Sequence, residues 1–296
     1  MNDDAVATHV REIAAAVAQE TGLIEAARAW APLRFEPWVH GDDALHLDDV
    51  SGVPFLQDIV GVQYYQLRTR VRAGDGDLYV AACPGLDAYE RYCRDTLKLG
   101  APTFVQASPV GPPIEVAKAA GQGKAFATLV DAARQRGALT VHPYMGIAPV
   151  WELGASIALE AGVPVRVLAP PPETTIYAND KACVTALAAR LVNPVLGFDA
   201  TVETHVAQTT DGLADGLRRL AGKHPRVALK MTRFASAMGN RVFDASALLA
   251  LDPGQLHAVV QSFLDDKGWV AGQNVMAVAW HEGAPSPSTQ LWIPTT

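Results

Sequence analysis

Short apolar runs alternate with helical segments between residues 77 and 168, and this rhythm constrains the fold more than any other feature of the chain. Such runs, when they alternate with helices of about 10–15 residues, indicate βαβ units and a parallel sheet. We therefore expect an α/β fold here. The predicted strands are residues 77–82, 103–106, 138–141 and 163–168, and the predicted helices are residues 86–99, 124–136 and 149–161.

The rhythm changes after Pro170-Pro171-Pro172, which we interpret as a domain boundary. A chain of 296 residues is long enough for two domains. Asp252 and Pro253 form a helix start, because Asp is a good N-cap and Pro suits the first helical position. Beyond the boundary we expect helices at residues 179–191, 210–221 and 253–264 and strands at residues 226–231, 240–243, 275–280 and 289–293.

The first 76 residues are less regular. Apolar residues at helical spacing predict two helices within residues 5–30, separated at Thr21-Gly22. Residues 31–76 contain short strand-like runs interrupted by proline, glycine and aspartate. They give no clear pattern.

Composition excludes several classes of protein. The net charge of −7 opposes general binding to nucleic acid or to an anionic membrane surface. The chain has no basic, apolar leader and no run of about 18–20 apolar residues, so neither a secretory signal nor a membrane span is expected. Three cysteines without CxxC spacing indicate reduced thiols and a cytoplasmic protein. The eight histidines form no HxxxH or HxH pair, which disfavours a zinc hydrolase. His142 follows a predicted strand and could line a substrate cleft, but we expect it to be a capped loop residue.

Two lysines stand where sequence physics does not favour them. Lys181 lies in the first turn of a predicted helix, where the helix dipole disfavours a cation unless an anionic ligand also binds there. Lys230 lies in the apolar strand 226–231, on the same face as Ala228, and its charge needs a partner if that face is buried. Phosphate groups would satisfy both lysines. The alternatives are an exposed first-turn lysine offset by Asp180, and a strand lysine that meets a carboxylate or reaches solvent.

A loop of small residues follows Lys230 directly. Its Ala235, Ser236, Ala237 and Gly239 would let backbone N–H groups approach a phosphate chain closely. An ordinary hairpin connection has the same composition.

Together these features resemble the ATP-grasp superfamily, which includes biotin carboxylase, carbamoyl-phosphate synthetase and many carboxylate–amine ligases. In that family an Asp-Lys pair opens a helix, as Asp180-Lys181 does here, and a later strand carries a second lysine into a small-residue loop. Lys230 lies 49 residues after Lys181 and precedes such a loop. The family's acidic hinge residue is replaced by the run 277–280, with Glu282 close behind. The resemblance implies nucleotide-binding roles for Lys181, Lys230, Ser236, Ala237, Met238, Gly239, Ala279, Trp280 and Glu282.

The resemblance also implies an architecture and a reaction. Residues 1–172 would form a Rossmann-like pre-ATP-grasp domain with an N-terminal helical extension, and residues 173–296 an α+β ATP-grasp region that is incomplete at its C-terminus. The expected reaction is ATP-dependent ligation of a small carboxylate to an amine through an acyl phosphate, in a monomer or a homodimer. The Mg²⁺ ligands of the family would follow Thr296, so we assign no metal ligand and no catalytic residue.

Two other interpretations stay open. The chain could be a non-catalytic nucleotide-binding fragment or scaffold that needs a missing C-terminal segment or partner. It could also be a Rossmann-type enzyme that uses another nucleotide, although Cys83-Pro84-Gly85 makes a poor glycine-rich turn. ADP release in the presence of ATP and amino acids would separate an active ligase from a binding fragment.

Overall fold

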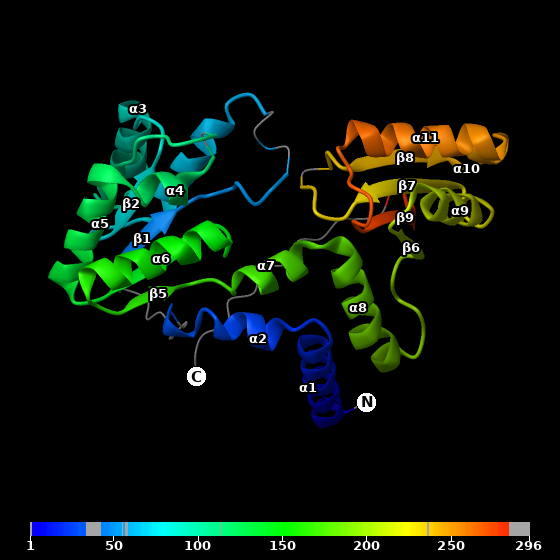
Figure 1. The fold of residues 1–296 in the computed structure, drawn as a ribbon, viewed down its shortest axis with the longest axis horizontal. Helices are drawn as coiled ribbons and strands as arrows, with labels where there is room; N and C mark the ends of the chain where they lie inside the picture. The colour runs from blue at the N-terminus through cyan, green and yellow to red at the C-terminus, as the bar shows by residue number, and fades with distance from the viewer. Residues whose placement is uncertain are drawn as a thin grey trace. The chain divides into compact units, whose positions relative to one another are not determined.

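The computed structural model describes residues 2–33, 43–54, 56, 59–112, 114–235 and 237–283. The chain divides into two compact units, one of residues 22–176 and one that joins residues 2–21 to the chain from residue 177 onward. Both contain a β-sheet covered by helices (Figure 1), and the chain is an α/β protein, as predicted. No helix in the described ranges is both long and apolar enough to cross a bilayer.

The unit of residues 22–176 is built on a parallel sheet of five strands in the order β3-β2-β1-β4-β5. The strands are β1 (Ala44–Leu47), β2 (Leu78–Ala81), β3 (Thr103–Gln106), β4 (Leu139–Pro143) and β5 (Val165–Val167). The helical segments are α2 (Leu23–Arg28), Ala31–Leu33, the 3₁₀ helix Val62–Arg72, α3 (Asp87–Arg91), the π-helical turn Tyr92–Thr96, α4 (Val116–Ala120), α5 (Gly123–Arg136), α6 (Ala148–Ala161) and the greater part of α7 (Pro172–Asn179).

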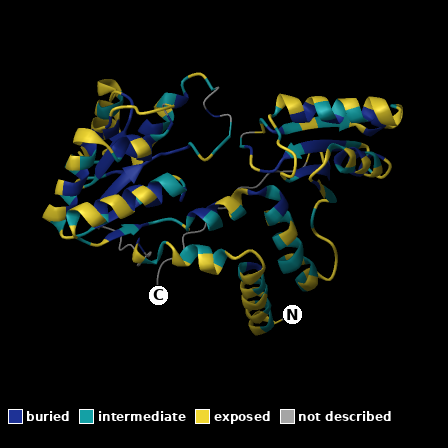
Figure 2. Ribbon diagram, viewed as in Figure 1, coloured by how far each residue is buried: buried dark blue, intermediate teal, exposed yellow. Residues whose placement is uncertain are grey.

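Alternation along the strands sorts their side chains between two faces of this sheet. Leu45 and Leu47 of β1 join the main core with α4, α5 and α6. Ala81 of β2 faces the other way, against Leu67 of the 3₁₀ helix. Strands β1 and β2 are fully buried and β4 nearly so, whereas edge strand β3 is partly exposed, as are the outer faces of α5 and α6 (Figure 2). The sheet is therefore covered by helical segments on both faces.

The second unit carries an antiparallel sheet of four strands in the order β6-β9-β7-β8. Helix α9 packs on β6, β7 and β9, and α10 and α11 pack beside α9. The strands are β6 (Thr204–Ala207), β7 (Arg226–Met231), β8 (Asn240–Asp244) and β9 (Val275–Ala279), and the helices are α1 (Asp3–Glu20), α8 (Lys181–Leu196), α9 (Thr210–Ala221), α10 (Ala245–Leu249) and α11 (Pro253–Asp266).

Local signals placed many of these elements correctly. Gly137 ends α5 and Gly162 ends α6 in left-handed backbone, a conformation that glycine adopts without a steric penalty. The start of α11 is a capping box, in which Asp252 accepts from the backbone N–H of Gln255 while the Gln255 side chain accepts from the backbone N–H of Asp252. These boundaries confirm the predicted helices.

Three expectations were wrong in detail. The strand-like runs of residues 31–76 include one strand, β1, but the longest element there is the 3₁₀ helix Val62–Arg72. His142 was expected in a capped loop, but it lies within β4, which extends to Pro143. Helix α8 continues past the predicted end at Leu191 to Leu196, despite Pro194, and stops at left-handed Gly197. The predicted strand 289–293 lies outside the described residues.

Helix α1 groups with the second unit rather than with the parallel sheet. Its Glu20 pairs with Arg190 of α8 at 2.7 Å, and His9 lies 3.0 Å from the Arg190 carbonyl oxygen. Helical periodicity cannot reveal a partner that is 170 residues away in the chain. The division of the sequence at residue 172 remains a prediction.

Candidate functional site

Strand β7 places Lys230 on one face of the antiparallel sheet. Val227 and Leu229 are fully buried on the face covered by α9, whereas Ala228 joins a small cluster on the opposite face. Lys230 shares the face of Ala228 and lies opposite Met276 of β9 in register. The alternation expected from the sequence is therefore confirmed, and it directs the lysine away from the main core.

Lys181 is the first residue of α8. Asp180 caps this helix, accepting from the backbone N–H of Ala182 at 3.0 Å and of Cys183 at 3.4 Å. The Lys181 ammonium donates to the carbonyl oxygens of Phe234 at 2.5 Å and Thr232 at 3.2 Å. Both acceptors belong to the segment that follows β7, so Lys181 is held against that segment.

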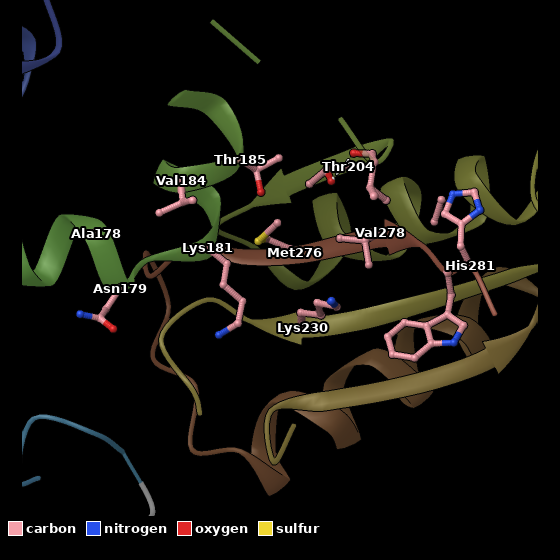
Figure 3. A pocket seen from close by; sticks show the side chains of 13 residues that line it. Ala178, Asn179, Lys181, Val184, Thr185, Thr204, Lys230, Met276, Val278 and His281 are labelled. Atoms are coloured by element: carbon pink, nitrogen blue, oxygen red, sulfur yellow. Dashed lines mark hydrogen bonds between the residues drawn. The ribbon is translucent and has the colours of Figure 1, made fainter. Parts of the chain in front are cut away.

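A pocket of about 590 Å³ opens between α8 and the exposed face of the sheet, within the second unit (Figure 3). Its size lies within the range of about 300–1,000 Å³ that is usual for small-molecule sites. Lys181 and Lys230 both line it, from different elements. The lining residues are Ala178, Asn179, Lys181, Val184, Thr185, Val202, Thr204, Lys230, Met276, Val278, Ala279, Trp280 and His281.

The charge of this pocket is positive and uncompensated by ion pairs. In the part of the chain that the structure describes, neither lysine lies within ion-pair distance of a carboxylate. Burial lowers the pKa of Lys181, and the nearby charge of Lys230 lowers it further, while Asp180 acts in the opposite direction. The Lys230 ammonium lies over the Trp280 ring, 5.3 Å from its centroid. The pocket thus holds two cations that disfavour each other.

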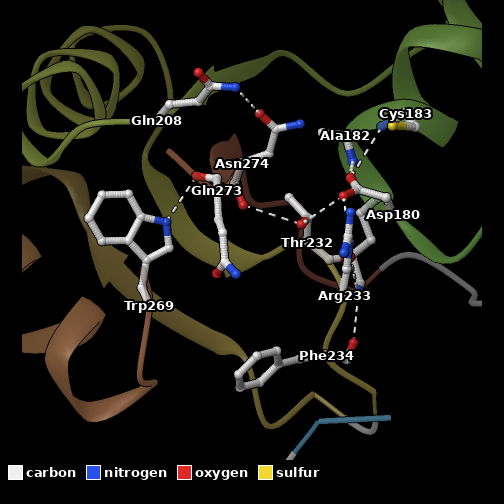
Figure 4. A network of polar contacts seen from close by, with 11 residues as sticks. Asp180, Ala182, Cys183, Gln208, Thr232, Arg233, Phe234, Trp269, Gln273 and Asn274 are labelled. Atoms are coloured by element: carbon white, nitrogen blue, oxygen red, sulfur yellow. Dashed lines mark hydrogen bonds and ion pairs between the residues drawn. The ribbon is translucent and has the colours of Figure 1, made fainter. Parts of the chain in front are cut away.

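A buried polar network fixes the start of α8 relative to the end of β7 (Figure 4). The Asp180 carboxylate is almost fully buried, and the Thr232 hydroxyl lies 3.2 Å from it and 3.2 Å from the carbonyl oxygen of Asn274. Arg233 donates to the same carboxylate at 3.2 Å. Because these contacts join α8, β7 and the segment before β9, they determine where Lys181 can point.

The small-residue loop does not line the pocket in its described part. Ala237 adopts left-handed backbone with φ of 60°, which is unusual for alanine. Gly239 is small for a packing reason, since an added Cβ would lie 2.6 Å from the Cβ of Phe234. Met238 is half-buried, and Ser236 lies outside the described residues. The expected phosphate contacts of these four residues remain a proposal.

Of the three residues expected to form the adenine hinge, two line the pocket and Glu282 does not. Ala279 and Trp280 line the pocket. The backbone N–H of Ala279, however, donates to the backbone carbonyl oxygen of Glu203, and that of Trp280 donates to the backbone carbonyl oxygen of Arg226. Those two N–H groups are therefore engaged within the sheet. Glu282 forms an ion pair with Arg226 and does not line the pocket.

The sequence reasoning missed several residues of this pocket. Met276 and Val278 could have been found, because alternation along β9 places them on the face of Lys230. Thr204 lies on β6, a strand that the sequence pattern did not reveal. Thr185 lies one turn after Lys181 on α8, which is the spacing that brings side chains to the same helix face.

The described residues contain no group of three or more histidine, cysteine, aspartate or glutamate side chains that could hold a metal ion. The three cysteines are free thiols, and burial raises the pKa of Cys83 and Cys183.

Comparison with known proteins adds one structural likeness. No family model matches the chain, and no curated protein matches it either. Among solved structures it is similar to the crystal structure of D-alanyl-alanine synthetase A from Vibrio cholerae O1 biovar eltor, with 16% sequence identity and a TM-score of 0.30. The match covers 48% of this chain and 37% of that chain. A likeness of this size assigns no residue role and no activity to the present protein.

Proposed function

We propose that the pocket between α8 and the antiparallel sheet binds the phosphate groups of ATP. The observation that carries this proposal is that Lys181 and Lys230 line one pocket without forming an ion pair in the described part of the chain. Lys181, whose pKa is lowered by burial and by the nearby charge of Lys230, would gain from a polyanion that both lysines share. Such a ligand would raise the Lys181 pKa again, and it would stabilise the folded unit by mass action.

The rest of the pocket suits a nucleotide. Met276, Val278 and Trp280 offer an apolar surface for the adenine base. Thr185 and Thr204 offer hydroxyl groups for the ribose. Since the N–H groups of Ala279 and Trp280 are engaged in the sheet, the base would depend on stacking and on other polar groups of the lining.

The reaction we propose is that of an ATP-grasp ligase. A small carboxylate would take the γ-phosphoryl group of ATP, giving ADP and an acyl phosphate, and an amine would then displace phosphate to form an amide. Lys181 and Lys230 would neutralise the charge that moves with the phosphoryl group. Lys181 would also hold the segment after β7 close to the nucleotide, through the Thr232 and Phe234 carbonyls.

Mg²⁺ accompanies the nucleotide in such reactions. The lining of this pocket contains no aspartate or glutamate, so the described residues do not fit a magnesium site and we assign no step to the metal.

Calorimetric titration with ATP tests the nucleotide proposal. Lys230→Ala is expected to lower the affinity at least tenfold, which corresponds to about 1.4 kcal/mol. Lys118→Ala is the matched control, because Lys118 is an exposed lysine that pairs with Glu115 at 2.7 Å in the other unit. Equal ATP affinity in wild type and Lys230→Ala would contradict the proposal.

Turnover is a separate question. Purified protein is mixed with ATP, Mg²⁺ and a panel of amino acids, and ADP is measured. Amino-acid-dependent ADP release supports a ligase. Tight ATP binding without release supports a non-catalytic nucleotide-binding protein instead.

A further inference from the structure

The parallel sheet has a second place where a ligand could bind, at the carboxyl ends of β1 and β4. In the order β3-β2-β1-β4-β5 the chain leaves β1 toward β2 and β3, then returns to the other side for β4 and β5. Connections that diverge in this way leave a crevice at the carboxyl ends of the two central strands. The two ends are adjacent, because the backbone N–H of Tyr144 donates to the Leu47 carbonyl at 3.0 Å.

Arg68 lies at the carboxyl ends of these two strands, where aromatic rings position it. Its guanidinium lies 4.6 Å from the ring centroid of Tyr65 and 5.0 Å from that of Tyr144. Its Nε donates to the Tyr65 carbonyl at 3.1 Å and lies 3.5 Å from the Asp48 carboxylate. The side chain is nevertheless 46% exposed, and its two terminal amino groups contact no hydrogen-bond partner among the described residues. The guanidinium is thus oriented while its outer edge stays open.

Arg72 supplies a second cation beside the first. It forms a short ion pair with Asp48 and donates to the Pro143 carbonyl at 3.2 Å, so it links the ends of β1 and β4. Asp48 directly follows β1 and is almost fully buried. Burial raises the pKa of Asp48, while Arg72 and Arg68 lower it.

Charge balance at this place favours an anion. Arg68 and Arg72 bring two positive charges, and Asp48 is the one carboxylate within ion-pair distance of them among the described residues. The neighbouring Asp49 is turned away, since its carboxylate accepts from Ser51 and from the backbone N–H of Ala117. One positive charge is left over, on a planar group whose donors match the two oxygens of a carboxylate.

We propose that Arg68, Arg72, Asp48 and Tyr144 form a binding site for a small monocarboxylate. Arg68 donates its outer edge to the carboxylate, and the Tyr65 and Tyr144 rings hold the guanidinium plane in place. The ion pair between Arg72 and Asp48 lies beside Arg68 and links the ends of β1 and β4. The planar edge of Arg68 matches the two oxygens of a carboxylate. The site lies within one unit, and its assignment does not depend on nucleotide binding in the other.

Saturation-transfer NMR on the full chain, without nucleotide, tests this site. The probes are acetate, lactate and benzoate, each compared with its neutral amide (acetamide, lactamide and benzamide). At least one carboxylate is expected to bind saturably at millimolar concentration and at least tenfold more tightly than its amide. Arg68→Gln is expected to weaken that binding at least tenfold.

Arg94→Gln is the matched control, because Arg94 is equally exposed at 48% and pairs with Asp95 on the surface of the same unit. Thermal unfolding verifies that both variants are folded. The proposal is overturned by any of three results: no carboxylate binds more tightly than its amide, Arg68→Gln binds like wild type, or Arg94→Gln weakens binding as much as Arg68→Gln. Because no nucleotide is present, failure of the ATP proposal leaves this test intact.

Discussion

Arg70 in the parallel-sheet unit and the two pocket lysines in the other unit are all cations within the fold, but they are neutralised differently. Arg70 is fully buried, and it donates to both carboxylate oxygens of Glu90, at 2.7 and 2.8 Å. Its remaining donors reach the carbonyls of Ala73 at 3.0 Å and Gly100 at 2.8 Å. Among the described residues, the Lys181 ammonium donates to two backbone carbonyl oxygens, and the Lys230 ammonium lies over the Trp280 ring.

This difference separates a structural cation from a functional one. Glu90 forms an ion pair with Arg70 inside the fold, and the hydrogen bond from Arg70 lowers the pKa of Glu90. No carboxylate among the described residues pairs with either pocket lysine, and the pKa of Lys181 is lowered by burial and by Lys230. A fold gains no stability from two unpaired ammonium groups in one pocket. The proposed anionic ligand would account for their position.

Arg70→Met gives the largest expected effect. The substitution removes the guanidinium from Glu90, which keeps Tyr79 as a donor, and from two carbonyl groups. Breaking a buried ion pair from one side costs about 3–5 kcal/mol, and because Glu90 is partly exposed we expect the lower end of this range. Urea unfolding followed by circular dichroism measures the change. A loss below about 1 kcal/mol would place Arg70 among ordinary surface pairs. Arg94→Met, at an exposed arginine that pairs with Asp95, is the control and should change little.

His46 and His142 of the parallel sheet differ from the arginine and the lysines, because burial favours their neutral form. His46 and His142 lie opposite each other in register on β1 and β4, with ring centroids 5.0 Å apart. Burial lowers the pKa of His142 to about 4, and Arg72 and His46 lower it further. The His46 pKa is also lowered, chiefly by burial. Protonation at this place would add charge next to Arg72.

The pH dependence follows from the sign of this shift. Above the ordinary histidine pKa of 6.5, His142 is neutral in both the folded and the unfolded state, so His142 does not change the stability with pH in that range. Between pH 6.5 and about 4 the unfolded state binds the proton first, and stability falls. His142→Gln should therefore remove a loss on the order of 2–4 kcal/mol over this window, as measured by urea unfolding at several pH values. Parallel pH profiles for wild type and the variant would count against this account, and exposed His257→Gln is the control.

How far the sequence could predict these features depends on whether the signal is local. The N-cap of α11 and the ends of α5 and α6 depend on local signals, and they were predicted correctly. Alternation in β7 is local as well, and it placed Lys230 on the correct face. The convergence of Lys181 with Lys230 was inferred by resemblance rather than from local physics.

Other features depend on partners that are distant in the chain. Strand β1 is four residues long and contains a histidine, so its apolar run is too short to distinguish from a loop. Strand β6 reads Thr-His-Val-Ala and forms because β9 offers it a hydrogen-bonding edge. Arg70 meets Glu90 across 20 residues, and Asp180 meets Thr232 across 52. No pattern in a single sequence reports such pairs.

Asp180 and Asp252 both cap a helix through their side chains, and comparing them tests how strongly the buried network around Lys181 stabilises the fold. Asp180 caps α8 and also contacts Thr232 and Arg233, whereas Asp252 caps α11 through exposed hydrogen bonds with Gln255. Replacing an Asp cap by alanine costs about 0.5–2 kcal/mol. We expect about 2 kcal/mol for Asp180→Ala, because the buried Thr232 hydroxyl loses a partner as well, and about 1 kcal/mol for Asp252→Ala. Urea unfolding measures both, and equal losses would show that the buried network adds nothing beyond the cap.

Lys230→Met is expected to change the free energy of unfolding least, and to raise it rather than lower it. The methionine keeps a similar apolar stem against Met276 and Val278, and its sulfur replaces the ammonium over the Trp280 ring with a contact of comparable strength. What remains is relief of the repulsion felt by Lys181, a gain of a few tenths to about 1 kcal/mol that shrinks with added salt. Saturating ATP should reverse the order, because ligand at one hundred times its Kd stabilises the wild type by about 2.7 kcal/mol. A variant less stable than wild type without ATP would mean that Lys230, like Arg70, belongs to the structure of the unit rather than to its ligand.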